Sequence, residues 1–184
     1  MNLIGHIKDF FNLVNIQQIE IYNEFSLQHE LGLYLRNHLN PTFKIQFERN
    51  IKFFGIQQKL IKKELDIVIY NLLADEKYAI ELKFPKNGQY PESMFSFAKD
   101  IKFMEQIKDN NFTHTYAITY VEDKLFYSGS NTTGIYSYFR SSQPLHGEII
   151  KPTGKKDEQF HINGSYQIHW ETLSGNSKYY LVEI

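Results

Sequence analysis

The chain has 184 residues, a formal net charge of −1 and no cysteine. The missing cysteine excludes disulfides, thiolate zinc sites, iron–sulfur clusters and cysteine nucleophiles. The near-neutral charge provides no overall basic field for a nucleic acid, but residues 44–63 carry six basic residues against one acidic residue.

The first residues, MNLIGHIKDFFNLVNI, include Lys8 and Asp9 and do not have the pattern of a signal peptide. No uncharged apolar run reaches the length of a membrane span. We therefore expect a cytoplasmic protein with no membrane partner. The length fits one domain, with residues 1–121 as its core and 122–184 as a C-terminal extension packed on it.

In the first half of the chain, helices are predicted over residues 3–14 and 22–39. Leu27, Leu31 and Leu35 recur at helical spacing in the second, and Pro41 ends the helical region. Alternating apolar and polar residues predict a strand over 43–49. Two apolar runs predict neighbouring strands over 64–71 and 77–84.

In the second half, Pro91 fits the first turn of a helix that runs to about Asn110. Glu105 lies on its apolar face and is expected to extend past the edge of the core. Residues 113–121 predict a central strand because nearly all are apolar or β-branched. Helix signals over 122–143 are ambiguous, 144–164 is predicted to be loop-rich, and strands are predicted over 165–170 and 178–184.

This order of elements predicts an α/β fold, with a mixed central sheet flanked by helices and a C-terminal extension that contains strands. Charged residues interrupt the two neighbouring apolar strands at 64–71 and 77–84. Charged groups near a buried sheet need partners or a metal ion. We therefore expect the chemistry of the chain to lie in this pair of strands.

Asp66 begins the first strand of the pair, and Glu81 and Lys83 end the second. Side chains two residues apart on a strand face the same way, so Glu81 and Lys83 share a face while Leu82 points to the opposite layer. Asp66, Glu81 and the Leu82 carbonyl would supply the oxygen ligands that Mg²⁺ prefers, with Mn²⁺ as a substitute. Lys83 would orient an attacking water, and a nearby cation would depress the pKa of Lys83. The ordinary alternative is a lysine paired with two acids at a sheet edge.

Asp66 followed by Glu81-x-Lys83 on the next strand resembles the motif of the PD-(D/E)xK nuclease superfamily, which has the restriction-endonuclease-like fold. The resemblance covers residues 22–121, although Leu65 stands where the superfamily often has a proline. It implies a further catalytic glutamate on the helix before the sheet, at Glu30, for which a plain helix-surface role is the alternative.

The resemblance also implies Mg²⁺-dependent hydrolysis of phosphodiester bonds, with DNA as the expected substrate and RNA as the second choice. A restriction or defence enzyme, a mobile-element nuclease and a toxin nuclease all fit the motif. Cleavage of both strands of a duplex would favour a homodimer. The alternative function is a non-catalytic nucleic-acid-binding or interaction module that keeps the fold and uses its carboxylates structurally.

Two further groups of residues are candidates for contact with a nucleic acid. Lys59, Lys62 and Lys63 precede Asp66 and would contact phosphates, unless they only protect a sheet edge. Gln89 and Tyr90 follow the second strand of the pair and would contact a sugar or a base, unless they form a plain strand-to-helix connection.

Overall fold

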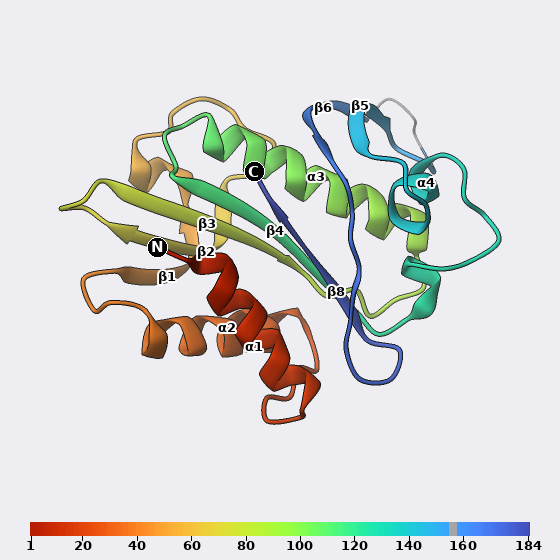
Figure 1. Ribbon diagram of the computed structural model, residues 1–184. Helices are drawn as coiled ribbons and strands as arrows, with labels where there is room; N and C mark the ends of the chain where they lie inside the picture. Colours follow the sequence, from red (N-terminus) through yellow and green to blue (C-terminus); the bar gives the residue numbers. More distant parts are fainter. Residues whose placement is uncertain (155–157) are drawn as a thin grey trace.

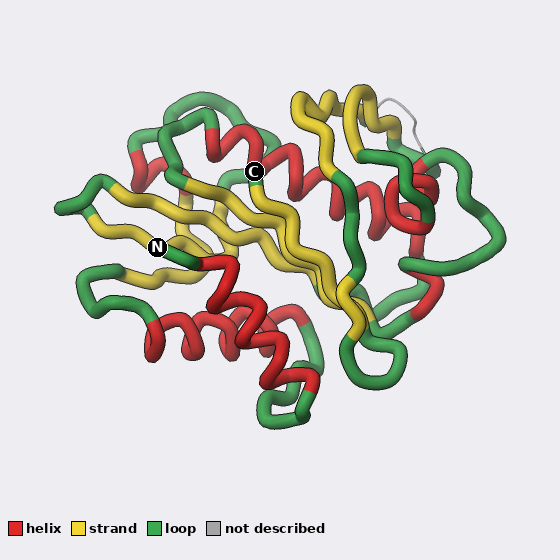
Figure 2. The backbone as a smooth tube through the Cα atoms, in the orientation of Figure 1, coloured by secondary structure: helices red, strands yellow, loops and turns green. Residues whose placement is uncertain are grey.

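A computed structural model describes residues 1–154 and 158–184 of the chain (Figure 1). It has an α/β architecture, in which a mixed six-stranded sheet of order β1-β2-β3-β4-β8-β7 lies between helical layers. Strands β5 and β6 form a separate hairpin (Figure 2). The helices are α1 (Leu3–Asn15), α2 (Glu24–His38), α3 (Tyr90–Lys108) and α4 (Ile135–Arg140), with short 3₁₀ turns at Ile51–Phe54 and Lys124–Phe126. The strands are β1 (Lys44–Asn50), β2 (Glu64–Asn71), β3 (Glu76–Lys83), β4 (His114–Val121), β5 (Leu145–Ile150), β6 (Gln159–Tyr166), β7 (Glu171–Thr172) and β8 (Lys178–Glu183).

The α/β class and the mixed sheet flanked by helices are confirmed, as are the predicted helices and strands up to residue 121 and the last strand. The prediction for 144–154 and 158–170 was wrong: the loop-rich stretch contains β5 and most of β6, and 165–170 is largely not a strand. The part of this prediction on residues 155–157 lies outside the described residues. Gly147 was predicted to be a loop residue, but it lies inside β5 with a φ of 73°, where the pairing with β6 shifts register. A glycine at a β-bulge looks like a turn residue in the sequence.

Helices cover both faces of the sheet (Figure 1). The α1 and α2 helices pack on one face through a cluster that includes Leu3, Phe11 and Leu31. The α3 helix and the β5–β6 hairpin cover the other face, through a second cluster that includes Phe97 and Ile162. Among the described residues, no helix is long and apolar enough to cross a membrane.

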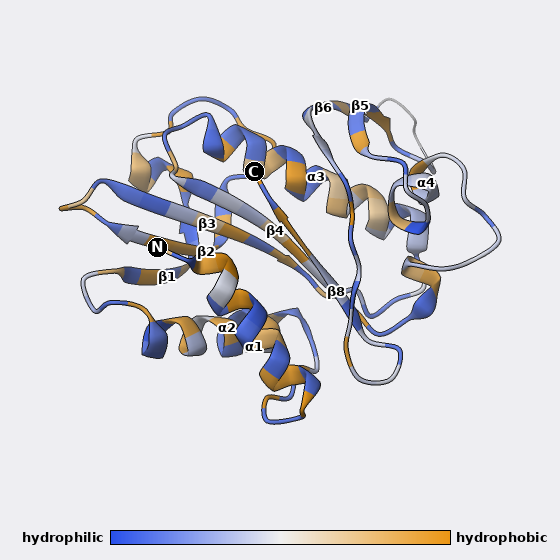
Figure 3. Ribbon diagram, in the orientation of Figure 1, coloured by the Kyte–Doolittle hydropathy of each residue, from blue (hydrophilic) through white to orange (hydrophobic). Residues whose placement is uncertain are grey.

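Strand β3 is buried on both of its faces, and Figure 3 shows apolar colouring along the central strands. Ile80 and Leu82 point toward α1 and α2, whereas Ala79 packs in the cluster on the α3 side. Because side chains alternate along a strand, Glu81 and Lys83 also point toward α3. Two charged residues therefore enter the layer between the sheet and α3.

The C-terminal region is part of the sheet, since β8 pairs with β4 in antiparallel orientation. Phe11 of α1 stacks on Tyr179 of β8 with ring centroids 3.8 Å apart. Glu105 of α3 was expected to extend past the edge of the core, but it is buried. It accepts hydrogen bonds from the main-chain N–H groups of Asn163 and Gly164, at 3.1 and 2.7 Å, and so attaches β6 to α3.

Gly32 allows α2 to lie close against β1, because a Cβ at this position would overlap the ring of Phe47. We predict that Gly32→Ala destabilises the protein by about 1–3 kcal/mol through overpacking. In a Phe47→Ala background the same change should be neutral or stabilising, since alanine is the better helix former by about 1 kcal/mol. Urea denaturation of the four proteins measures both values, and equal effects of Gly32→Ala in the two backgrounds would contradict the close approach.

Candidate active site

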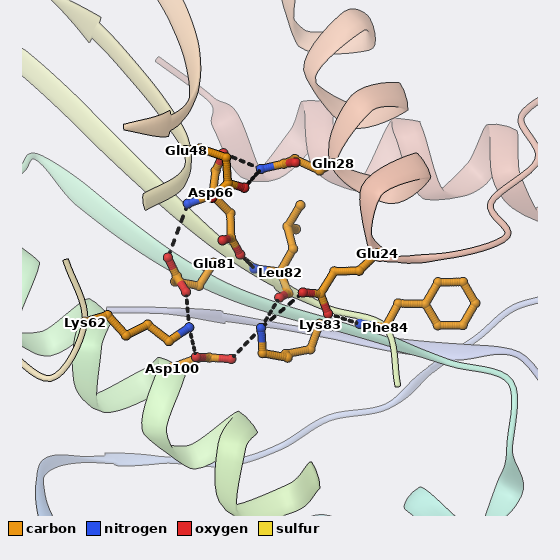
Figure 4. Close-up of polar contacts among 10 residues, drawn as sticks. All are labelled: Glu24, Gln28, Glu48, Lys62, Asp66, Glu81, Leu82, Lys83, Phe84 and Asp100. Atoms are coloured by element: carbon orange, nitrogen blue, oxygen red, sulfur yellow. Dashed lines mark hydrogen bonds and ion pairs between the residues drawn. The ribbon is translucent and has the colours of Figure 1, made fainter. Parts of the chain in front are cut away.

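Asp66 and Glu81 lie side by side on β2 and β3 (Figure 4). The strands are antiparallel with Ile67 opposite Ile80, which brings Asp66 next to Glu81. The main-chain N–H of Leu82 donates to Asp66 Oδ2 at 2.7 Å, and the main-chain N–H of Asp66 donates to Glu81 Oε1 at 3.3 Å. Each carboxylate is therefore oriented by the backbone of the neighbouring strand.

Lys83 points into the same layer and contacts three oxygens. Its Nζ donates to the Leu82 carbonyl at 2.9 Å and lies 3.4 Å from Glu24 Oε1 and 3.6 Å from Asp100 Oδ2. The structure thus brings together Asp66, Glu81 and Lys83. It adds Asp100 of α3, which is only 2% exposed and which the sequence analysis did not single out.

Lys62 approaches Asp100 and Glu81 from the segment before β2 (Figure 4). Its Nζ lies 2.5 Å from Glu81 Oε2 and also contacts Asp100 Oδ1. The carboxylate of Asp100 therefore lies between two ammonium groups, one on each oxygen. The resulting group is called here the carboxylate–lysine cluster and consists of Glu24, Lys62, Asp66, Glu81, Lys83 and Asp100.

The glutamate that α2 contributes to the cluster is Glu24, not Glu30. Glu24 Oε2 also accepts a hydrogen bond from the main-chain N–H of Phe84 at 3.0 Å. Gln28, one helical turn further on, donates to the main-chain oxygen of Asp66 at 2.7 Å. Glu30 lies roughly 200° round the helix from Gln28, and its Oε1 lies 3.6 Å from Nδ1 of its neighbour His29. The structure therefore does not bring Glu30 to the position that the resemblance implied.

Glu48 of β1 lies next to Asp66 and was also missed in the sequence. Gln28 donates to Glu48 Oε1 at 2.6 Å with the same Nε2 atom that donates to Asp66. The backbone of Glu48 has a φ of 48°, in the left-handed region that a non-glycine residue rarely occupies. Such a conformation costs about 1–3 kcal/mol and persists only where its surroundings impose it.

Two hollows on the surface adjoin the cluster. One, of about 510 Å³, is lined by Asp66, Lys62, Lys63 and Glu48 among others. The second, of about 450 Å³, is lined by residues that include Lys59 and Lys63. Lys63 borders both hollows, so a lysine-lined surface leads to Asp66. Of the three lysines predicted to contact phosphates, Lys59 and Lys63 are exposed, whereas Lys62 points inward.

Gln89 and Tyr90 lie at the start of α3, and the structure does not bring them to the cluster. Tyr90 is about 15 Å along the helix from Asp100, given a rise of about 1.5 Å per residue. Its hydroxyl donates to Asp123 Oδ2 at 2.5 Å. Tyr90 instead lines a separate hollow of about 430 Å³ with Lys86 and Glu122. The contact of Gln89 and Tyr90 with a nucleic acid stays a prediction.

The cluster carries four carboxylates and two ammonium groups, so its formal charge is negative. Burial raises the pKa of Asp66 to about 6, although Lys83 and the N–H of Leu82 act to lower it. Burial and the neighbouring Asp66 carboxylate also raise the pKa of Glu81 well above its usual range, against the opposing effect of Lys62. In both cases burial is the largest cause, so the two carboxylates are costly to keep charged in this layer.

The two lysines are held in their charged form. For Lys83, burial is the largest single effect and acts to lower the pKa, but the carboxylates of Asp100, Glu24 and Asp66 together outweigh it and the pKa is raised. The same balance between burial and the carboxylates of Asp100 and Glu81 raises the pKa of Lys62. The depressed pKa expected for Lys83 beside a cation is therefore not found for the protein alone, where carboxylates surround it.

The predicted metal ligands are hard oxygen donors, which suit Mg²⁺ or Mn²⁺. Asp66 and Glu81 lie side by side, so both carboxylates could face one cation. In residues 1–154 and 158–184, however, no group of three or more acidic or histidine side chains is arranged to hold a metal ion. The predicted set of Asp66, Glu81 and the Leu82 carbonyl has two such side chains, and the Leu82 carbonyl accepts from Lys83.

The comparisons with known proteins found no counterpart of this chain. No family model matches the sequence, and neither curated proteins nor solved structures gave a match. The resemblance to the PD-(D/E)xK superfamily therefore rests on the motif residues and on their arrangement in the sheet.

We predict that Asp66→Asn stabilises the metal-free protein at a pH of about 7.5. The folded-state pKa of Asp66, about 6, lies above its model value of 3.8, so the folded state binds the proton more tightly. Stability from this proton is present below a pH of about 4 and is lost as the pH rises through about 6. Removing the carboxylate should therefore gain at most about 3 kcal/mol at pH 7.5, and nothing near pH 4.

Urea denaturation with a chelator present, across this pH range, measures the difference. Glu64→Gln is the matched control, because Glu64 is exposed and lines the same hollow. If Asp66→Asn is less stable than the wild type at pH 7.5, burial of the Asp66 carboxylate does not raise its pKa as described.

Proposed function

We propose that the protein is a metal-dependent nuclease of the PD-(D/E)xK type that hydrolyses phosphodiester bonds, with DNA as its substrate. The observation that carries the proposal is the meeting of Asp66, Glu81 and Lys83 on adjacent strands, where each carboxylate is oriented by the backbone of the neighbouring strand. Such a site offers carboxylate oxygens to a cation, and its acidic and basic groups are the types that phosphodiester hydrolysis uses.

Each residue of the cluster has a role in this proposal. Asp66, Glu81 and the Leu82 carbonyl would hold Mg²⁺ or Mn²⁺, which supplies charge stabilisation and acidifies a bound water. Lys83 would orient the attacking water and stabilise negative charge on the phosphate. Glu24 and Asp100 act on Lys83, because their carboxylates lie 3.4 and 3.6 Å from its Nζ.

The lysine-lined surface supports a nucleic acid as the substrate. Lys59 and Lys63 are exposed. Lys59 borders one hollow, and Lys63 borders both that hollow and the one that Asp66 lines. Ammonium groups on such a surface would neutralise phosphates of the backbone and guide one of them toward the cluster. This contribution is independent of base sequence, so it fits both DNA and RNA, and a panel of both substrates distinguishes them.

A second candidate function is a non-catalytic nucleic-acid-binding or interaction module. It is favoured by the contacts of Lys62 with Glu81 and of Lys83 with the Leu82 carbonyl, which satisfy two of the three proposed ligands without a metal. In such a module the cluster would be a structural ion-pair network. Calorimetric titration with Mn²⁺ separates the two functions. A nuclease should bind Mn²⁺ and its Asp66→Asn variant should not, whereas a non-catalytic module should show no such metal site.

We predict that Asp66→Ala and Lys83→Ala each reduce Mg²⁺-dependent cleavage by on the order of 10²–10³-fold. Asp66→Ala removes a metal ligand, and Lys83→Ala removes the ammonium beside the attacked phosphate. Cleavage of labelled DNA and RNA, with Mg²⁺, Mn²⁺ or chelator, is the measurement. A wild-type protein that cuts no substrate with either metal would contradict the proposed nuclease.

Glu24 and Glu30 provide a matched pair of variants on the same helix. Glu24→Gln should lower the cleavage rate because Glu24 holds Lys83, whereas Glu30→Gln should leave it unchanged. The opposite result would restore Glu30 to the role that the resemblance implied.

We also predict that the double variant Lys59→Glu, Lys63→Glu weakens DNA binding and flattens its dependence on salt. Each lost phosphate contact should reduce the slope of log K against log salt by about 0.9 for duplex DNA. Fluorescence anisotropy with Asp66→Asn protein measures binding without cleavage. Lys8→Glu on α1 is the control, since Lys8 is exposed on a helix of the opposite face. Unchanged affinity in the double variant would remove this surface from the binding site.

A further inference from the structure

Lys62 has an unusual position for a residue of an exposed basic segment. Its side chain is 27% exposed and its ammonium lies between Glu81 and Asp100, whose side chains are 0% and 3% exposed. The Nζ also lies 5.9 Å from the centre of the Phe103 ring. Lys62 therefore reaches from the surface into the layer between the sheet and α3 (Figure 4).

The contacts of Lys62 fall on an atom that the proposed metal site requires. Glu81 Oε1 accepts from the main-chain N–H of Asp66, so Oε2 is its other oxygen, and that atom contacts Lys62. A cation that approaches Glu81 through Oε2 meets the Lys62 ammonium there. The two positive groups cannot share this position, because like charges at contact distance repel strongly.

The side chain of Lys62 can leave this position without a change in the backbone. The neighbouring main chain is attached to α3, since the N–H of Ile61 donates to Gln106 Oε1 at 2.9 Å. Lysine has a flexible four-carbon stem and a strongly hydrated charge. Lys62 already lines the hollow of about 510 Å³ beside Asp66, so rotation of its stem would place the ammonium in that hollow.

We propose that Lys62 is a resident counter-ion of the site. Its ammonium neutralises Glu81 and Asp100 while no divalent cation is bound, and it moves from Glu81 into the hollow when a cation binds. This inference rests on the proposed function, because it requires that Asp66 and Glu81 bind a metal. Lys62 therefore has a different role from Lys59 and Lys63, which would contact phosphates. Because the metal has to displace Lys62, part of the metal's binding energy is used in that displacement.

The test is calorimetric titration of Mn²⁺ into the wild type, Lys62→Met, Lys63→Met and Asp66→Asn. We expect Lys62→Met to bind Mn²⁺ at least tenfold more tightly than the wild type. Lys63→Met is the matched control, because it removes an exposed charge from the same hollow and should change the affinity by less than about twofold. Thermal unfolding gives a second readout: Mn²⁺ should raise the melting temperature of Lys62→Met more than that of the wild type.

Lys62→Gln keeps an N–H donor for Glu81 without the charge, and it replaces Lys62→Met if that variant does not fold. Equal or weaker Mn²⁺ binding in the folded Lys62 variant overturns the counter-ion role while leaving the nuclease proposal intact. An equal gain in Lys63→Met also overturns it, because the effect would then be one of general charge. If neither the wild type nor the Lys62 variants bind Mn²⁺, the proposed metal site itself fails.

Discussion

The burial of β3 on both faces is the constraint on which the rest of the structure depends. One face of the strand packs on α1 and α2 and the other on α3. Glu81 and Lys83 lie on the second face, where water is largely excluded, and a charge in such a place requires partners. Asp100 on α3 and Lys62 before β2 meet this requirement. Lys62 contacts Glu81 and Asp100 contacts Lys83, so the segment before β2 and helix α3 are each attached to one of these two residues.

A buried ion-pair network of this kind is not an efficient way to stabilise a protein. The cost of removing each charge from water offsets most of the attraction between partners, and apolar residues of similar volume are often as stable. Burial raises the pKa of Asp66, a sign that its charged form is costly in this layer. The left-handed backbone at Glu48 adds further strain beside it. Both features lie around the hollow that reaches Asp66, and their concentration there is consistent with a site that has a task beyond folding.

The sequence predicted the central strands, α3 and the juxtaposition of Asp66 with Glu81 and Lys83, because apolar runs and side-chain alternation are local signals. Asp100 carried a signal that was available: it is an acidic residue on the helical face formed by Phe97, Ile101 and Met104. Glu24 had no distinguishing signal, since acidic residues are ordinary in the first turn of a helix.

Long-range geometry accounts for what the sequence did not predict. Lys62 could not be separated from Lys59 and Lys63, because the direction of a side chain in an irregular segment depends on what packs against it. The same limit applies to Glu24 and Glu30: helical spacing defines faces of α2 but not which of them meets β3. The β5–β6 hairpin was missed because its strands are partly exposed and contain glycine.

Glu105 and Asp100, the member of the carboxylate–lysine cluster on α3, lie on the same helix but place different demands on the chain over evolution. The hydrogen bonds that Glu105 accepts from β6 include those from the main-chain N–H groups of Asn163 and Gly164. The side chain at position 163 can therefore be replaced without loss of the hydrogen bond from its main-chain N–H. The partners of Asp100 are the side chains of Lys62 and Lys83, so a substitution at either lysine removes one of the two counter-charges of a buried carboxylate. Among descendants of this protein, Asn163 should vary freely, whereas the residues at 62, 83 and 100 should change together or not at all.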